Sequence, residues 1–224
     1  SLPTYPLQAV RAGAASHVAL MVGTTRDEQK LYVAPDRPAI DGAELARQVR
    51  QYLPRRAADR AGEVIEVYRT SRTVRGLPVT HNDIADAVAT ASRFRFPATQ
   101  LAEAQAAHRP SFVYQVDWES PARRGTLGAC HGIEIPFVFG TVGRTGNDRM
   151  TGTGPDADRL AEQMMDAWIA FARTGDPSHD GIGPWPAYDT TGRHTMIFGR
   201  SCRVDAAPFE EERALWESMV RDRG

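Results

Sequence analysis

Apolar residues along this chain follow two patterns, unbroken runs and stripes at helical spacing. Residues 18–22 form an unbroken apolar run, and residues 112–118 are rich in β-branched and aromatic side chains. Both patterns favour strands, and the first is typical of a strand buried on both faces in a parallel sheet covered by helices. Gly23 is expected to end that strand. A short strand is also predicted at residues 195–198, and residues 202–204 could pair near it.

The striped segments predict helices at residues 41–53, 62–68, 83–94, 98–107, 156–173 and 208–220. Asp41 followed by Glu44 resembles a capping box, and Gly175 stands where a helix C-cap is expected. Pro97 is expected to interrupt the helical pattern. The prolines in residues 1–13 are expected to keep that lead-in from being helical, with a short helical turn at most. Without an internal repeat or a convincing linker, residues 1–224 are expected to form a single structural unit.

Composition excludes several classes of protein. The formal net charge of -1 gives no basic surplus for nucleic acid. No window approaches the ~18 apolar residues that a membrane span needs, and no signal peptide opens the chain. The two cysteines, Cys130 and Cys202, do not make a disulfide framework; they could pair, but reduced thiols are expected.

Two side chains at the ends of predicted strands could carry chemistry. Glu28 follows the run at residues 18–22, and His131 stands in a glycine-rich loop after the strand at residues 112–118. An acid after one strand and a histidine after a later one is the chain order of a nucleophile–acid–histidine hydrolase from its second member onward. Taken singly, Glu28 could equally be a solvated turn carboxylate, and His131 a structural residue.

Four separated stretches resemble one known family. They are residues 23–28, 112–118, 128–140 and 168–188, the last with Gly175-Asp176-Pro177 and Trp185-Pro186-x-Tyr188. In this order they resemble the C-terminal part of a type B carboxylesterase, the cholinesterase-like branch of the α/β-hydrolases. The resemblance implies the C-terminal part of an α/β-hydrolase fold, a mostly parallel sheet flanked by helices. It further implies Glu28 as the acid and His131 as the base of a Ser-Glu-His triad, a small-molecule ester as substrate, and no cofactor.

The chain departs from the family's pattern because it lacks a Gly-x-Ser-x-Gly nucleophile elbow and a Gly-rich oxyanion loop. Only Ser201 follows Gly-x, and Arg203 replaces the second glycine; the other serines are Ser1, Ser16, Ser71, Ser92, Ser111, Ser120, Ser178 and Ser218. We therefore expect the C-terminal portion of an esterase, inactive alone. Its expected partner is the missing N-terminal half of the same protein, and it could self-associate through an exposed sheet edge.

Other interpretations of the same residues stay open. Glu134, three residues after His131, could form a metal pair with it, but the other histidines are scattered and no metal is expected. Glu134 is instead predicted to support the histidine loop without touching substrate. Cys130 could substitute for the missing nucleophile, although adjacent residues of an extended loop point apart. The alternative from another class is a non-catalytic, cholinesterase-like interaction protein.

Overall fold

The computed structural model describes residues 4–221, so the first three residues of the predicted lead-in lie outside the described part. The chain groups into two compact units rather than the single unit expected. The first combines Ser1–Leu31 with Pro97–Pro208, and the second combines Tyr32–Phe96 with Phe209–Gly224. The division follows from the packing, because each unit surrounds a separate cluster of buried apolar side chains.

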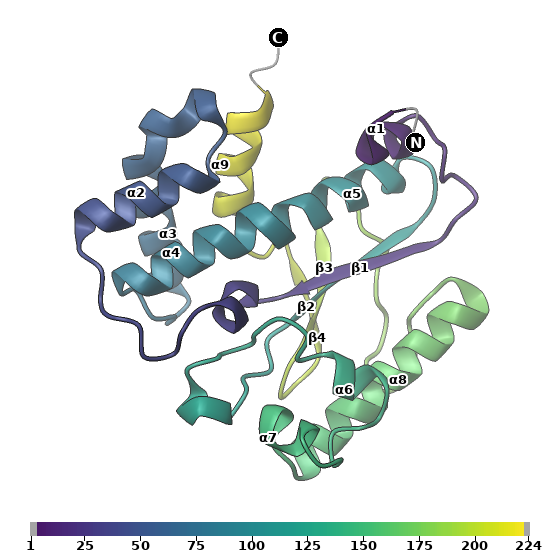
Figure 1. The fold of residues 1–224 in the computed structure, drawn as a ribbon. Helices are drawn as coiled ribbons and strands as arrows, with labels where there is room; N and C mark the ends of the chain where they lie inside the picture. The colour runs from purple at the N-terminus through teal and green to yellow at the C-terminus, as the bar shows by residue number, and fades with distance from the viewer. Residues whose placement is uncertain (1–3, 222–224) are drawn as a thin grey trace. The chain divides into compact units, whose positions relative to one another are not determined.

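The first unit contains a four-stranded sheet in the order β1-β2-β3-β4 (Figure 1). Strands β1 (Leu20–Thr25), β2 (Ser111–Val116) and β3 (His194–Phe198) are parallel, and β4 (Arg203–Ala206) pairs with β3 antiparallel. The register sets Gly23 beside Tyr114 and Thr25 beside Val116. The carboxyl ends of β1 and β2 therefore meet at one edge of the sheet.

The first strand differs from its prediction. It runs from Leu20 through Gly23 to Thr25, and most of its residues are half-buried rather than buried on both faces. Among the described strands, β1 is at the edge of the sheet, which leaves one side of it without a neighbouring strand. Gly23 stays extended and does not end the strand; an added Cβ there would lie 2.4 Å from the ring of Tyr114.

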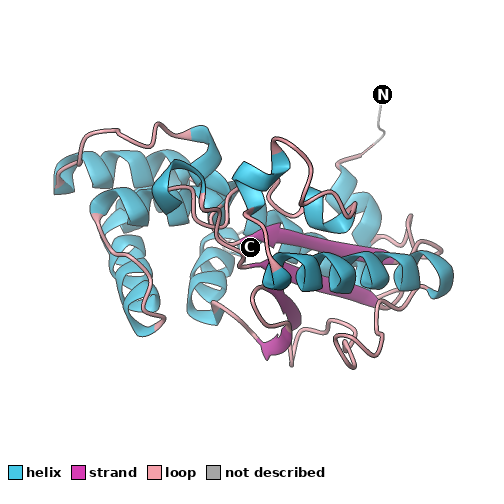
Figure 2. Cartoon of the chain, turned by 90° about the horizontal axis from the view of Figure 1, so that it is seen from below, coloured by secondary structure: helices cyan, strands magenta, loops and turns pink. Residues whose placement is uncertain are grey.

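Helix α8 (Pro155–Thr174) supplies much of the first unit's core. Leu160 and Met164 are buried on it, and both belong to the cluster that contains Phe112 of β2 and Phe198 of β3. Figure 2 shows this long helix alongside the magenta strands. The helix ends, as predicted, at a left-handed Gly175. The unit's other helices are α1 (Pro6–Arg11), α5 (Phe96–Ala106, counted here from Pro97), α6 (Ile135–Val138), α7 (Asn147–Thr151) and the 3-10 turn η4 (Ala122–Gly125).

The second unit is helical. Its elements are α2 (Gly42–Tyr52), η2 (Arg55–Arg60), α3 (Ala61–Val74), α4 (His81–Thr90), the π-helical turn η3 (Ala91–Arg95) and α9 (Glu210–Arg221). Asp41 caps α2 by accepting a hydrogen bond from the Glu44 amide, as predicted. Trp216 of α9 donates its indole N–H to the Tyr68 hydroxyl of α3 at 2.8 Å, inside the unit's apolar core.

Pro97 does not interrupt the helical pattern as expected. The turn η3 precedes it, and the Phe96 amide bonds the Ala91 carbonyl five residues back. Proline has no N–H to donate, and the wider π-helical turn directly before it accommodates its ring without ending the helical run. Pro97 therefore follows a local widening of a continuous helical run.

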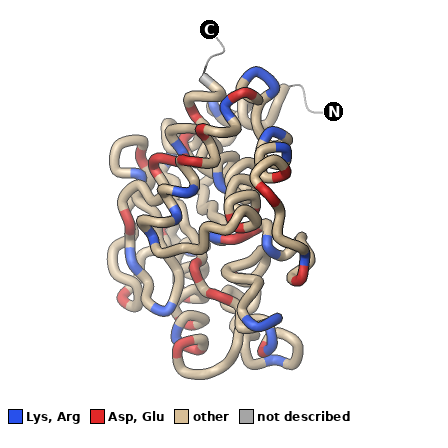
Figure 3. The backbone as a smooth tube through the Cα atoms, turned by 90° about the vertical axis from the view of Figure 1, so that its left-hand side faces the viewer, with Lys and Arg blue, Asp and Glu red and all other residues tan. Residues whose placement is uncertain are grey.

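Basic and acidic positions are interspersed along the backbone, as the tube in Figure 3 shows. None of the helices among residues 4–221 is long and apolar enough to cross a membrane.

Candidate active site

Glu28 begins the 3-10 turn η1 (Glu28–Tyr32), with Arg26 and Asp27 between it and the end of β1. Its side chain is only 6% exposed, and both carboxylate oxygens have partners. Oε1 accepts a hydrogen bond from the Thr25 backbone N–H at 2.7 Å, and Oε2 lies 2.6 Å from Nδ1 of His131. The end of the strand thus holds one oxygen and aims the other at the histidine.

His131 stands in a loop between β2 and α6, and 43% of its side chain is exposed. Gly128 and Gly132 on either side have φ of +55° and +75°, in the left-handed region that favours glycine. The loop is also tied inward, because the Ser120 amide donates to the Gly128 carbonyl at 2.9 Å. Since a carboxylate can only accept, Nδ1 carries the proton of the shared bond, and Nε2 is the basic nitrogen.

The contact that a Ser-Glu-His triad would need between Glu28 and His131 is present in the structure. The two residues are 103 positions apart, and parallel pairing of β1 with β2 brings them to the same edge. A carboxylate on one ring nitrogen orients an imidazole and stabilises the charge that it gains when the other nitrogen takes a proton. The pair can therefore act as an oriented general base.

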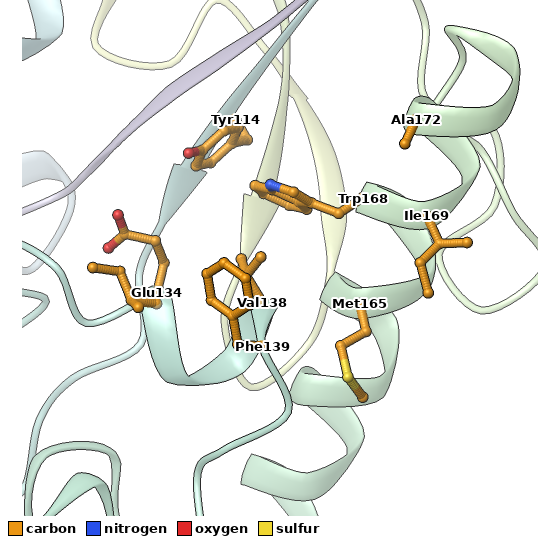
Figure 4. Close-up of a pocket in the computed structure, with 9 residues that line it drawn as sticks. Tyr114, Glu134, Val138, Phe139, Met165, Trp168, Ile169 and Ala172 are labelled. Atoms are coloured by element: carbon orange, nitrogen blue, oxygen red, sulfur yellow. The ribbon is translucent and has the colours of Figure 1, made fainter.

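Glu134 immediately precedes α6 and lines a groove of about 540 Å³ (Figure 4). The groove is formed by Tyr114 of β2 with apolar side chains of the α6 and α8 segments, namely Ile135, Val138, Phe139, Met165, Trp168, Ile169 and Ala172. Oε2 of Glu134 is buried and has no hydrogen-bond partner within the described chain. Burial first, and then the charge of Glu28, raises the pKa of Glu134.

Neither alternative role predicted near His131 gains support. Within residues 4–221, no group of three or more histidine, cysteine, aspartate or glutamate side chains could hold a metal ion. Cys130 is a free, buried thiol whose pKa is raised to about 11, chiefly by burial, so the nucleophilic thiolate is scarce at neutral pH.

Sequence reasoning missed Asp27 and Gly128, which join the acid turn to the histidine loop. An oxygen of Asp27 accepts a hydrogen bond from the Ala129 amide, and an added Cβ at Gly128 would lie 2.6 Å from that oxygen. The sequence shows Asp27 next to Glu28. The chain order of a hydrolase suggests His131 as the partner of Glu28, but it suggests no partner for Asp27.

The parallel strands, with an acid and a histidine at their carboxyl ends, are arranged as in the α/β-hydrolase fold. Residues 1–216 match the profile of the carboxylesterase family, and the chain belongs to that family. It is 31% identical over 215 residues to the para-nitrobenzyl esterase of Bacillus subtilis, covering 95% of this chain and 40% of that protein. It is 32% identical over 201 residues to the phenmedipham hydrolase of Pseudarthrobacter oxydans, covering 89% of this chain and 38% of that protein.

Solved structures agree with the sequence relatives. A PNB esterase structure superposes with a TM-score of 0.75 at 30% identity, over 95% of this chain and 41% of that one. A Geobacillus stearothermophilus carboxylesterase gives a TM-score of 0.72 at 29% identity, over 95% of this chain and 42% of that one. The chain thus spans about two fifths of the length of these relatives.

Proposed function

We propose that this chain is the C-terminal portion of a serine carboxylesterase and supplies the acid, Glu28, and the base, His131, of a Ser-Glu-His triad. The observation that carries the proposal is the 2.6 Å contact between Glu28 Oε2 and His131 Nδ1 at the carboxyl ends of two parallel strands. Membership of the carboxylesterase family supports a carboxylic ester as substrate. The serine and the oxyanion donors would come from the portion of the fold that this chain does not span.

In this mechanism the serine hydroxyl attacks the ester carbonyl while Nε2 of His131 takes its proton. Glu28, held by the Thr25 amide, keeps the Nδ1 proton in place and stabilises the imidazolium. The same imidazolium then protonates the leaving alkoxide, which departs as the alcohol. Water, deprotonated by His131, hydrolyses the acyl-enzyme and restores the serine.

We further propose that the complementary portion of the esterase fold packs into the groove beside Glu134. Ile135, Phe139 and Ile169 line it and are 55%, 72% and 47% exposed, although they are large apolar residues. Apolar surface of this kind marks a site of association. The unpartnered oxygen of Glu134 calls for a hydrogen-bond donor in the same partner. The open edge of β1 would accept a strand; a second copy of this chain could pair there in its absence.

A chimera tests the triad. The matched segment of the Bacillus subtilis esterase is replaced by this chain, and turnover of a para-nitrobenzyl ester is compared with that of the 224-residue chain alone. The chimera should hydrolyse the ester and the chain alone should not. His131→Ala in the chimera should lower kcat on the order of a thousandfold, because the base is lost.

The matched control is His108→Ala. His108 lies at the end of α5, where a ring nitrogen contacts the Arg11 carbonyl at 3.0 Å, and it has no part in the proposed triad. That chimera should keep its turnover. Hydrolysis by the isolated chain, with labelling by a serine-directed organophosphate, would contradict the proposed division of the triad. An inactive chimera of the right fold would favour the interaction-protein alternative.

A further inference from the structure

Asp27 connects the turn that carries the acid with the loop that carries the histidine. It directly precedes Glu28 and is 5% exposed. Its Oδ2 accepts a hydrogen bond from the Ala129 backbone N–H at 3.1 Å, and its own backbone N–H donates to the Ala129 carbonyl at 2.9 Å. Both bonds reach the same residue, two positions before His131.

Neighbouring cations balance the buried charge of Asp27. Arg26 donates to Oδ2 from Nε at 3.1 Å and from a terminal nitrogen at 3.0 Å, while Lys30 Nζ lies 3.9 Å from Oδ1. Burial alone would lower the pKa of the Arg26 guanidinium, but nearby carboxylates, Asp27 first among them, outweigh burial and raise it. These contacts leave the Asp27 side chain little freedom to move.

Gly128 permits the close approach of the loop to this carboxylate. An added Cβ at residue 128 would lie 2.6 Å from Asp27 Oδ2, and its φ of +55° is unfavourable for other residues. The backbone of the loop can thus reach Asp27 only because residue 128 has no side chain.

We infer that Asp27 is a positioning residue for the Glu28–His131 pair, an inference that rests on the proposed function. With the Ala129 backbone held at two points, the distance between the acid and the base is set before substrate binds. Without the carboxylate, the histidine loop keeps the bond from Ser120 and the backbone bond from the Asp27 N–H, but the Ala129 amide loses its acceptor and the loop is held to the acid turn at one point instead of two. Misplacement of a catalytic group by about 1 Å costs on the order of a hundredfold in rate.

The decisive measurement is the proton NMR resonance of the His131 Nδ1–H in the 224-residue chain, which reports the bond to Glu28 directly. The resonance is assigned by its loss in His131→Ala. Asp27→Ala should abolish it while the circular dichroism spectrum stays folded. Asp27→Asn keeps an oxygen that can accept from the Ala129 amide, so it should restore the resonance. If the negative charge of Asp27 were what matters, Asp27→Asn would leave the resonance lost.

Two further variants separate positioning from general stability. Gly128→Ala should also abolish the resonance, because its methyl displaces the Asp27 carboxylate without removing any charge. Glu119→Ala removes the exposed carboxylate that bonds Arg26 at 2.5 Å, leaves both Asp27–Ala129 bonds, and should keep the resonance. If Asp27→Ala does not fold, Asp27→Asn and Gly128→Ala still decide the question.

An undiminished Nδ1–H resonance in Asp27→Ala or in Gly128→Ala would overturn the inference, as would its loss in Asp27→Asn. In the chimera, Asp27→Ala should lower kcat on the order of a hundredfold with little change in KM, and Asp27→Asn should recover most of that loss. The NMR result needs neither a nucleophile nor turnover. An inactive chimera would therefore count against the proposed function and leave the positioning test standing.

Discussion

Two adjacent glutamates on α9 offer a direct test of how burial changes the contribution of an ion pair to the free energy of unfolding. Glu212 is 2% exposed, pairs with Arg95 at 2.7 Å and accepts a hydrogen bond from Ser71 Oγ at 2.5 Å. Glu211, beside it in the first turn, pairs with Arg75, but 43% of its side chain is exposed. The change Glu→Ala alters helix propensity, slightly in favour of alanine, by the same amount at both positions, and it has nearly the same helix-dipole cost.

Glu212→Ala should lower the free energy of unfolding by about 3–5 kcal/mol, because it leaves the guanidinium of Arg95 in a buried site without this carboxylate. The cation–π contact of Arg95 with Phe209, at 4.3 Å, favours the lower end of that range. Glu211→Ala should cost about 0–1 kcal/mol, since water screens an exposed pair. The expected difference between the two variants is therefore about 3 kcal/mol.

Urea denaturation measures both variants, and hydrogen exchange of the α9 amides assigns the change to the helical unit. A Glu212→Ala midpoint that equals that of Glu211→Ala would refute the reasoning, provided that the slope with urea is unchanged. A stabilised Glu212→Ala variant would mean that desolvation of the carboxylate outweighs its contacts.

Further predictions concern glycine and the groove. Gly23→Ala should lower stability by about 1–3 kcal/mol, because the methyl overlaps the Tyr114 ring, whereas Gly62→Ala, in open space on α3, should raise it by about 1 kcal/mol; thermal melts measure both. Burial, then Glu28, raises the pKa of Glu134, so the folded chain holds this proton to higher pH than the unfolded chain and loses stability as pH rises above ~4.3. Glu134→Gln should remove that loss, and melts of both proteins at about pH 4.5 and about pH 7.5 would show it; an equal pH dependence would contradict it.

Much of the fold follows from the sequence because local signals agree with it. Asp41 caps α2, Gly175 ends α8, and the run at residues 112–118 forms β2. The sequence did not predict that β1 extends to Thr25, because a glycine after an apolar run is typical of the end of a strand. The structure shows that residue 23 is glycine because the Tyr114 ring on the neighbouring strand leaves no room for a side chain. The division into two units depends on which helices share a core, and residues far apart in sequence decide that.

The candidate site was predictable only where chain order carries information. Glu28 and His131 follow successive parallel strands and resemble a known family, so their contact could be expected. The contacts of Asp27 with the Ala129 backbone cross 102 positions, and a backbone amide has no sequence signature. The buried Glu134 oxygen without a hydrogen-bond partner likewise cannot be predicted from the sequence, because it depends on the positions of all the side chains around it.

The indole of Trp216 and the hydroxyl of Tyr68 meet across 148 positions, and this separation has a consequence for the order of events during synthesis. A ribosome that has released α3 must still make strands β2, β3 and β4 before α9 emerges. At a synthesis rate of roughly 5–20 residues per second, the core of the helical unit stays without helix α9 for on the order of ten seconds. Folding of this unit should therefore be slow and late relative to its local helices. During that interval the apolar faces of α2, α3 and α4 are open to chaperones and to other nascent chains.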